Sequence, residues 1–290
     1  MAFLWGASWP AGRFIVQEMP PLTASALRFL LASAVLLPWM YMAGGFAQLK
    51  HWHWTRWLGM AAAGATGVFG YAACFLSGLQ YLPAGKAALI VTLNPVLTLF
   101  VAAWIFRERL NATIAWGMML AVIGAITVIS HGDLPFLLRG GIGRGEILIL
   151  GCVLCWVCYT LIGRWVMQGI DALSATVITS VWGAVLLLIF SWCVEGSTAY
   201  RESWNASAPT WSALLFLAWG ATALAYAWYF SGVKALGAGA ASGYITLVPV
   251  IGVVVSALWL GEVVDLYTVL GGVFAVCGTA IMHWGRLRLA

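Results

Sequence analysis

Two prolines, Pro95 and Pro249, are the first residues of this sequence that could take part in ligand chemistry, because each falls near the middle of a long apolar stretch. A proline inside a helix removes one backbone donor and frees a carbonyl, and in lipid that carbonyl needs a polar partner. Matching prolines in two helices therefore predict a hinge, or a bend that faces a polar site. A simple packing kink is the alternative, because membrane helices tolerate proline well.

Aromatic and polar side chains near the middle of other apolar stretches could line such a site. Trp and Tyr combine apolar rings with a hydrogen-bond donor, which suits an amphipathic solute. Asn94 places a polar group directly before Pro95, whereas Val248 precedes Pro249. Core packing is the alternative role for the aromatic residues. The candidate substrate-binding residues are Ser8, Trp9, Arg13, Tyr71, Asn94, Trp156, Tyr159, Tyr226, Tyr229 and Tyr244.

Ionisable side chains inside the apolar stretches are few, and none at mid-membrane depth is acidic. Arg13, Arg28 and Lys86 fall in the outer parts of their predicted helices, where long side chains can snorkel to the interface. The two arginines could instead attract the carboxylate of a ligand or join two helices. Glu108 and Glu262 end two predicted helices at equivalent places, which is typical of structural caps or gates. A proton relay through buried carboxylates therefore has no candidate residue.

Catalytic and metal-binding patterns are missing from the sequence. It contains neither H-E-x-x-H nor G-x-S-x-G, and its four histidines fall in loops or at the ends of apolar stretches. The six cysteines fall inside apolar stretches, where they are typical of small buried hydrophobic residues. We therefore predict no enzyme, no cofactor and no metal site. The cysteines are Cys74, Cys152, Cys155, Cys158, Cys193 and Cys277.

The elements that position these residues must be membrane helices. The chain is 63% hydrophobic and only 8% charged, whereas a soluble domain carries about a quarter charged residues. Apolar runs of roughly 20 residues, the length that crosses a bilayer, recur from end to end. The first run starts almost at Met1, so we expect the chain to be slightly truncated there. We predict an all-α integral membrane protein with ten transmembrane helices at residues 2–18, 22–43, 56–80, 83–106, 112–130, 145–167, 172–193, 211–233, 237–260 and 266–285.

Basic residues predict the orientation of these helices. Lys and Arg favour the cytoplasmic ends of short loops, and most of those near loops fall on the side of the N-terminus. We expect a multi-pass protein of the cell (inner) membrane with both termini cytoplasmic. The net charge of +5 is spread singly over short loops, which predicts no nucleic-acid partner. The basic residues on the N-terminal side are Lys50, Arg56, Arg107, Arg109, Arg164, Lys234, Arg286 and Arg288.

The second half of the sequence repeats the first. Short motifs recur at the same spacing within the opening helix of each half, and again from the third helix to the end of the fourth. Each half holds five predicted helices, an odd number, so the second half must enter the membrane in the opposite orientation. The predicted domains are residues 1–131 and 145–286. The matches are Trp5 with Trp156, Gly12 with Gly163, Arg13 with Arg164, Ser77 and Gly78 with Ser231 and Gly232, Thr92 with Thr246, Pro95 with Pro249, and Glu108 with Glu262.

Several motifs resemble those of the EamA-type permeases of the drug/metabolite transporter superfamily. The resemblance spans nearly the whole chain and is specific for the family, although poor for the substrate. It implies a five-plus-five inverted repeat, a central cavity lined by the first, third and fourth helices of each half, and export of amino acids or other small metabolites. The motifs are Leu4-Trp5-Gly6-Ala7-Ser8-Trp9, Arg28-Phe29, Leu93-Asn94-Pro95, Glu108-Arg109-Leu110, and Pro249 followed by Gly261-Glu262.

These patterns predict a secondary transporter, a permease that works by alternating access and exports amino acids or related metabolites. Nucleotide sugars or organic phosphates are an alternative, for which Arg13 with Arg28 is thin support. An intramembrane enzyme and a non-transporting scaffold are alternatives of other classes. A scaffold predicts no large cavity, and indifference to mutation at Trp9 or Pro95. The expected partners are a small-molecule substrate and membrane lipid, and the expected state is a monomer or weak homodimer.

Overall fold

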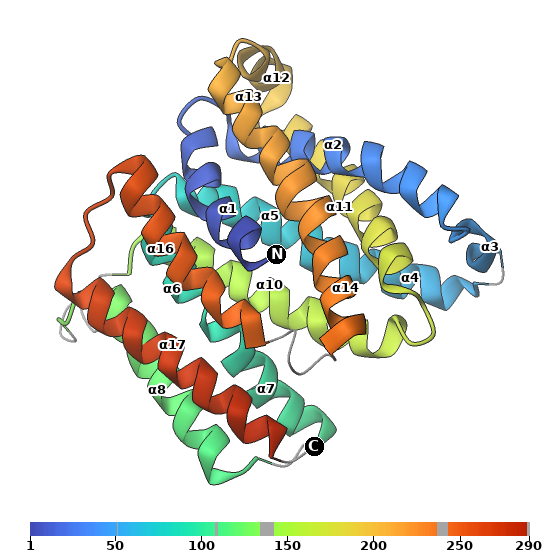
Figure 1. The fold of residues 1–290 in the computed structure, drawn as a ribbon. Helices are drawn as coiled ribbons and strands as arrows, with labels where there is room; N and C mark the ends of the chain where they lie inside the picture. Colours follow the sequence, from blue (N-terminus) through green and yellow to red (C-terminus); the bar gives the residue numbers. More distant parts are fainter. Residues whose placement is uncertain (51, 108–109, 134–141, 237–242, 289–290) are drawn as a thin grey trace.

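The structure is a computed structural model that describes residues 1–50, 52–107, 110–133, 142–236 and 243–288. Every element in these ranges is a helix (Figure 1). The first half contains α1 (Ala2–Ile15), α2 (Pro21–Met42), α3 (Phe46–Leu49), α4 (Trp54–Gly64), η1 (Ala65–Gly70), α5 (Tyr71–Leu79), α6 (Ala84–Ile90), α7 (Leu93–Phe106) and α8 (Ala112–Ser130).

The second half follows a similar order, and its surface helix α12 stands where the first half has the short helix α3; the sequence analysis predicted neither. Its elements are α10 (Arg144–Val166), α11 (Ala172–Val194), α12 (Gly196–Trp204), α13 (Ala208–Leu215), η2 (Phe216–Leu224), α14 (Ala225–Leu236), η3 (Tyr244–Thr246), α16 (Leu247–Leu260) and α17 (Leu266–Leu287).

Eight helices in the described ranges are long and apolar enough to cross a membrane. The helix from Tyr244 to Leu260 is apolar but shorter, and α1 has 14 residues and ends at Ile15, three residues before the predicted end. The predicted start of the ninth helix, at residues 237–242, lies outside the described residues. The long spans are Pro21–Met42, Trp54–Leu79, Ala84–Phe106, Ala112–Ser130, Arg144–Val166, Ala172–Val194, Ala208–Val233 and Leu266–Leu287.

Side chains at the helix starts explain where several spans begin. Asn111, Asp171 and Asp265 each accept a hydrogen bond from the backbone N–H three residues later, at the N-termini of α8, α11 and α17. Such caps satisfy donors that have no partner within the helix. Pro21 is the first residue of α2 and follows the short connection from α1 directly.

Glycines allow α8 and α17 to pack backbone against backbone along their length (Figure 1). A Cβ added to Gly124 would lie 2.4 Å from the nitrogen of Ala275, and one added to Gly278 would lie 2.4 Å from the nitrogen of Ala121. Small residues are the usual means by which membrane helices approach this closely. The last helices of the two halves are therefore fixed against each other.

The third span of each half contains a stretch of π-helix near its middle. These stretches, η1 and η2, fall at corresponding positions of the repeat. A π-helical turn changes the backbone hydrogen-bond pattern and is frequent at functional sites. The two halves thus share an irregularity that the sequence analysis did not predict.

In the fourth span of each half, the expectation that Pro95 and Pro249 lie in the middle of continuous helices is wrong. Pro95 and Pro249 are each the third residue of a helix, α7 or α16, that begins after an interruption. Proline is tolerated in a first turn because the backbone donors there have no partner within the helix. The hydroxyls of Thr92 and Thr246, one at each interruption, donate to the carbonyls of Leu89 and Gly243 at 2.6 and 2.7 Å.

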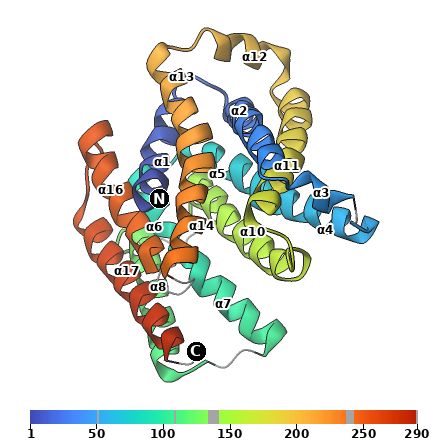
Figure 2. The same cartoon turned by 45° about the vertical axis from the view of Figure 1, so that its right-hand side comes forward.

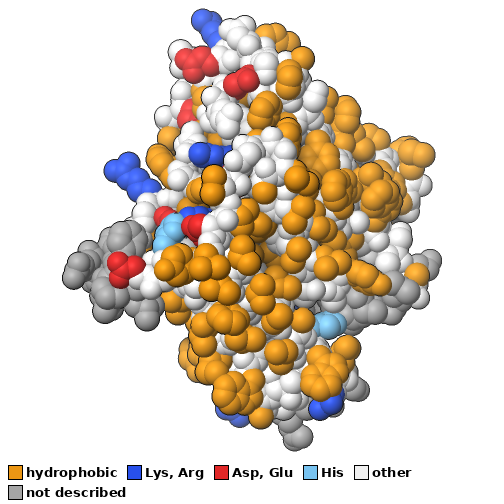
Figure 3. Space-filling model, turned by 60° about the vertical axis from the view of Figure 1, so that its left-hand side comes forward, with side chains coloured by type: hydrophobic (Ala, Val, Ile, Leu, Met, Phe, Trp, Pro, Cys, Tyr) orange, Lys and Arg blue, Asp and Glu red, His pale blue; other side chains and the backbone are white. Residues whose placement is uncertain are grey.

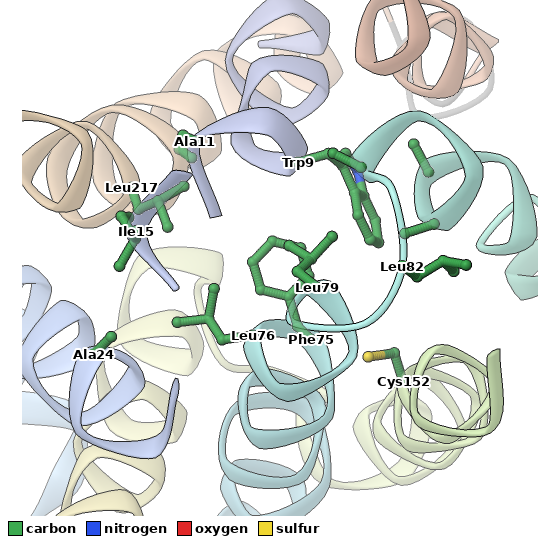
Figure 4. Packing of buried hydrophobic residues seen from close by; sticks show 14 of the residues in the cluster. Trp9, Ala11, Ile15, Ala24, Phe75, Leu76, Leu79, Leu82, Cys152 and Leu217 are labelled. Carbon is green, nitrogen blue, oxygen red and sulfur yellow. The ribbon is translucent and has the colours of Figure 1, made fainter. Parts of the chain in front are cut away.

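The first helix lies between the parts of the second half. In Figures 1 and 2, α16 flanks α1 on one side, and α13 and α14 flank it on the other. The main buried cluster gathers side chains from both halves, among them Trp9, Phe75, Cys152 and Leu217 (Figure 4). One hydrophobic core therefore joins the halves.

Hydrophobic side chains cover much of the face in Figure 3, as expected for a surface in contact with lipid. Acidic side chains gather at its upper left, whereas its lower edge shows Lys or Arg side chains without acidic ones. We call the end of the bundle that carries Glu18, Glu195, Glu262 and Asp265 the acidic face.

Candidate functional site

Aromatic side chains from both halves meet in the interior of the bundle. The ring centroids of Tyr71 on α5 and Trp156 on α10 are 5.7 Å apart, and those of Trp156 and Tyr159 are 5.5 Å apart. The backbone of η1 approaches this pair closely, since a Cβ on Gly67 would lie 2.2 Å from the Tyr159 ring. Three predicted site residues are thus brought together.

A second set of rings comes from α1 and α14. The centroid of Trp5 lies 5.4 Å from that of Tyr226 and 5.6 Å from that of Tyr229. Its indole nitrogen donates to the carbonyl of Ala221 in η2 at 3.0 Å. The six side chains of both sets are partly exposed although they face other helices. We call them the aromatic group: Trp5, Tyr71, Trp156, Tyr159, Tyr226 and Tyr229.

Arg28 on α2 links the two sets. Its Nη2 donates to the hydroxyl of Thr222 in η2 at 3.1 Å, and Tyr71 and Tyr226 lie within electrostatic range of its charge. The sequence analysis placed Arg28 where it could snorkel, but the side chain points into the bundle. The small residues Ser25 and Ala32, three and four positions away on the same helical face, could have indicated this inward face, and both are fully buried.

A cavity of about 270 Å³ adjoins the aromatic group. Tyr229 lines both the cavity and the aromatic group. Tyr244, a predicted site residue, also lines the cavity and is 54% exposed. The cavity is slightly smaller than typical small-molecule sites, which hold about 300 Å³ or more.

Three predicted site residues of α1 lie apart from the aromatic group or have other partners. Trp9 is only 3% exposed and packs edge-to-face on Phe75 with centroids 4.9 Å apart (Figure 4). Arg13 donates to the carbonyl of Leu79, at the end of α5. Ser8 donates to the carbonyl of Trp5 at 2.6 Å.

Asn94, the predicted polar handle of the fourth span, is 9% exposed, and its Oδ1 is buried without a hydrogen-bond partner. Glu108, predicted as a cap or gate, lies outside the described residues.

Carboxylates of the acidic face bind the N-termini of helices in the other half. Glu195, at the end of α11, accepts from the backbone nitrogens of Leu22 and Thr23 at 2.9 and 2.7 Å and from the Thr23 hydroxyl at 2.7 Å. Glu262, after α16, accepts from the backbone nitrogens of Ala84 and Gly85 at 2.8 and 3.0 Å. A carboxylate at a helix N-terminus interacts favourably with free N–H donors and the helix dipole.

Two further contacts on the acidic face also cross between the halves. Glu18 accepts from the backbone and hydroxyl of Ser207 at 2.7 and 2.8 Å, and these bonds lower the pKa of its carboxyl. Asp265 lies 3.4 Å from Lys86, with His131 3.3 Å away. Burial opposes its ionisation, but hydrogen bonds from Thr268 and the charge of Lys86 outweigh that effect and lower the pKa of Asp265 to about 2. Lys86, expected only to snorkel, is thus ion-paired.

The opposite end of the bundle has no carboxylate equivalent to Glu195 in the residues described. The residue that ends α2, as Glu195 ends α11, is Ala43. A contact between the halves at that end is the donation of Arg56 to the carbonyl of Gln168 at 3.1 Å. Among the residues that the structure describes, the contacts between the halves therefore differ at the two ends of the bundle.

The described residues contain no group of three or more His, Cys, Asp or Glu side chains that could hold a metal ion. Cys152 donates to the carbonyl of Tyr71 at 3.5 Å.

The described residues form many apolar spans and two halves with matching irregularities, which share an aromatic interior. These are features of a multi-pass membrane protein. Residues 1–130 and 143–284 match the model of the EamA-like transporter family, and the chain belongs to that family.

Relatives cover nearly the whole chain. It is 30% identical over 275 residues to "Uncharacterized transporter YyaM" of Bacillus subtilis (strain 168), which covers 94% of this chain and 88% of that one. It is 28% identical over 294 residues to the "Probable amino-acid metabolite efflux pump" of Salmonella typhimurium, covering 98% and 93%. It is 25% identical over 303 residues to "Uncharacterized inner membrane transporter YhbE" of Escherichia coli K12, covering 99% and 91%.

A solved structure described as "Crystal structure of protein" shares the fold. The TM-score is 0.66 at 20% identity, over 97% of this chain and 95% of that one.

Proposed function

We propose that the protein is a secondary transporter that exports an amino acid or a related small metabolite by alternating access, and that it is not an enzyme. The observation that carries the proposal is the aromatic group, to which α1 and α5 of the first half and α10 and α14 of the second half contribute. Transport sites commonly form where two halves of a repeat face each other near the midplane. The name of the Salmonella typhimurium relative supports an amino-acid metabolite as substrate.

The membrane arrangement belongs to the same proposal. Adding α1 and the helix from Tyr244 to Leu260 to the eight long spans gives ten, five in each half. The paired π-helical stretches and the paired interruptions before α7 and α16 support an inverted repeat. Basic residues opposite the acidic face support cytoplasmic termini in the inner membrane. A reporter fused after Ala290 that is active only outside the cell would contradict this orientation.

Alternating access is supported by the difference between the two ends of the bundle. On the acidic face, four carboxylates bind groups of the other half. Release of these contacts would let the halves separate there, while the aromatic group stays between them. The interruptions before Pro95 and Pro249 supply matching places where a helix can bend.

Counterflow in proteoliposomes tests the proposal. Purified protein is reconstituted with one unlabelled solute of an amino-acid, sugar, nucleoside and cation panel inside, and uptake of the labelled solute is measured. We expect uptake of at least one amino acid, and loss of most of it in Trp156→Ala and Tyr226→Ala. Trp204→Ala is the matched control, because Trp204 is 77% exposed on α12. Absence of uptake across the whole panel would contradict transport.

A further inference from the structure

Arg28 is a cation inside the membrane helices with no anionic partner among the described residues. Its guanidinium carbon lies 5.0 Å from the ring centroid of Phe29 and 5.8 Å from that of Phe75. Its Nη2 donates a hydrogen bond to the neutral hydroxyl of Thr222, and its Nε is buried without an acceptor. Within the part of the chain that the structure describes, Arg28 makes no ion pair.

The described residues offer no carboxylate at this depth. The eight acidic residues in the described ranges fall in loops, at helix ends or on α12, and the ninth, Glu108, lies outside those ranges. Two carboxylates lie near the start of α2, but both have other partners. Glu195 binds the N-terminus of α2, and Glu18 binds Ser207. A charge at bilayer depth is costly without a counter-ion, and such residues mark ligand pathways.

We infer that Arg28 binds the carboxylate of the transported solute, so that the site selects compounds with one carboxylate beside an apolar or aromatic body. This inference rests on the proposed function and names its substrate class. A guanidinium matches a carboxylate with two parallel hydrogen bonds. Arg28 offers the ligand a single positive charge, which matches a carboxylate better than a phosphate dianion, while Arg13 donates to the carbonyl of Leu79.

The surroundings of Arg28 suit the rest of such a solute. Tyr71 and Tyr226 lie close to its charge and add hydroxyl groups. From Tyr226 the aromatic group continues through Trp5 to Tyr229, which borders the cavity of about 270 Å³. A solute that enters from this cavity would meet rings first and the guanidinium beyond them.

A purely structural role is the competing explanation, in which Arg28 only ties α2 to η2 through Thr222. Two variants separate the roles. Thr222→Val removes this tie and leaves the guanidinium in place, whereas Arg28→Gln removes the charge and keeps a side chain that can donate to Thr222. Arg28→Lys keeps the charge but loses the paired donors.

Equilibrium binding to the purified full chain in detergent tests the inference without requiring transport. The probes are L-phenylalanine with L-phenylalaninamide, L-leucine with L-leucinamide, and phenyl phosphate. We expect wild type and Thr222→Val to bind at least one acid roughly 10-fold or more tightly than its amide, the range for a charge-assisted hydrogen bond. In Arg28→Gln this ratio falls to within about 3-fold, and in Arg28→Lys it is intermediate.

An unchanged ratio in Arg28→Gln overturns the inference, and so does wild-type binding of phenyl phosphate in preference to both acids, or of neither acid. If Arg28→Gln does not fold, a wild-type ratio in Arg28→Lys overturns it and a reduced one supports it. Counterflow with the same probes separates the two proposals. If the protein transports a probe but its preference for acid over amide does not depend on Arg28, only the carboxylate assignment is refuted. If binding depends on Arg28 but no probe is transported, only the proposed transport function is refuted.

Discussion

Replacing Glu195 by Gln is expected to shift the protein toward a state that is open on the acidic face. The carboxylate accepts three hydrogen bonds from the start of α2, two from backbone nitrogens and one from the Thr23 hydroxyl. Gln keeps one acceptor oxygen, but its amide group would face donors where the second oxygen was. The variant therefore loses both charge and complementarity at one helix N-terminus.

The size of the effect follows from these contacts. Hydrogen bonds to a charged group contribute about 1.5–3 kcal/mol, against about 1 kcal/mol for neutral pairs, and the helix dipole adds about 0.3–1 kcal/mol. Because Glu195 is half-buried, we take a net loss of about 2 kcal/mol, near the lower end. This loss corresponds to roughly a 30-fold change in the ratio of closed to open protein.

Distances between spin labels on the two halves measure this ratio. In a protein whose six cysteines are replaced, labels at Tyr81→Cys and Trp204→Cys occupy side chains that are 56% and 77% exposed. We expect a longer-distance population to grow in Glu195→Gln. Glu202→Gln is the control, because Glu202 is exposed on α12 and near the same face. A folded Glu195→Gln protein with an unchanged distance distribution would refute the assignment of Glu195 as a contact that closes this face.

Three further predictions concern stability, measured by thermal unfolding in detergent. Gly124→Ala should lower the free energy of unfolding by about 1–3 kcal/mol, because its Cβ would lie 2.4 Å from a backbone nitrogen of α17. Gly232→Ala is the control and should be neutral or slightly stabilising, because its Cβ would have no atom within 4 Å. Equal effects of the two variants would refute the close packing. The pKa of Asp265 is lowered from 3.8 to about 2. Its carboxylate therefore contributes about 1 kcal/mol of stability after solvent screening, which is present above about pH 4 and is lost as the pH falls toward 2. Asp265→Asn should remove this acid-dependent part, and an identical pH profile in the variant would contradict the prediction. Thr92→Val leaves the carbonyl at the helix interruption without its hydroxyl partner and should cost about 1 kcal/mol, so an unchanged melting temperature would refute a role for this bond.

The sequence predicted most of the helices because length and apolar composition determine a membrane span almost alone. It also gave Tyr71, Trp156 and Tyr159 as candidate substrate-binding residues, and the structure brings their rings together, while their role in binding stays a prediction. The sequence did not predict the irregularities inside the helices. A π-helical stretch such as η1 and the interruption before Pro95 depend on tertiary partners for their freed carbonyls, and no short sequence pattern encodes those partners.

The predicted roles of α1 show a different limit. Trp9 and Trp5 are four residues apart and have similar chemistry, yet Trp9 is 3% exposed in the core whereas Trp5 joins the aromatic group. For Arg28 the sequence left snorkelling, binding of a ligand carboxylate and a tie between helices open, because position along the helix alone does not say which helical face the side chain occupies. Which of two similar residues faces a shared interior depends on how the second half packs, and that is a property of the fold.

The single-sided placement of Glu195, with Ala43 at the corresponding helix end, has a consequence for kinetics. Two conformations held by unequal contacts have unequal populations, and a ligand's apparent affinity for a minor conformation is reduced by its fractional population. In the proposed carrier, solute presented opposite the acidic face would half-saturate transport at a lower concentration than solute presented on the acidic face. At equilibrium the two unidirectional fluxes are equal whatever the populations of the conformations. This asymmetry therefore sets which compartment the carrier samples most readily and leaves the final distribution of the solute unchanged.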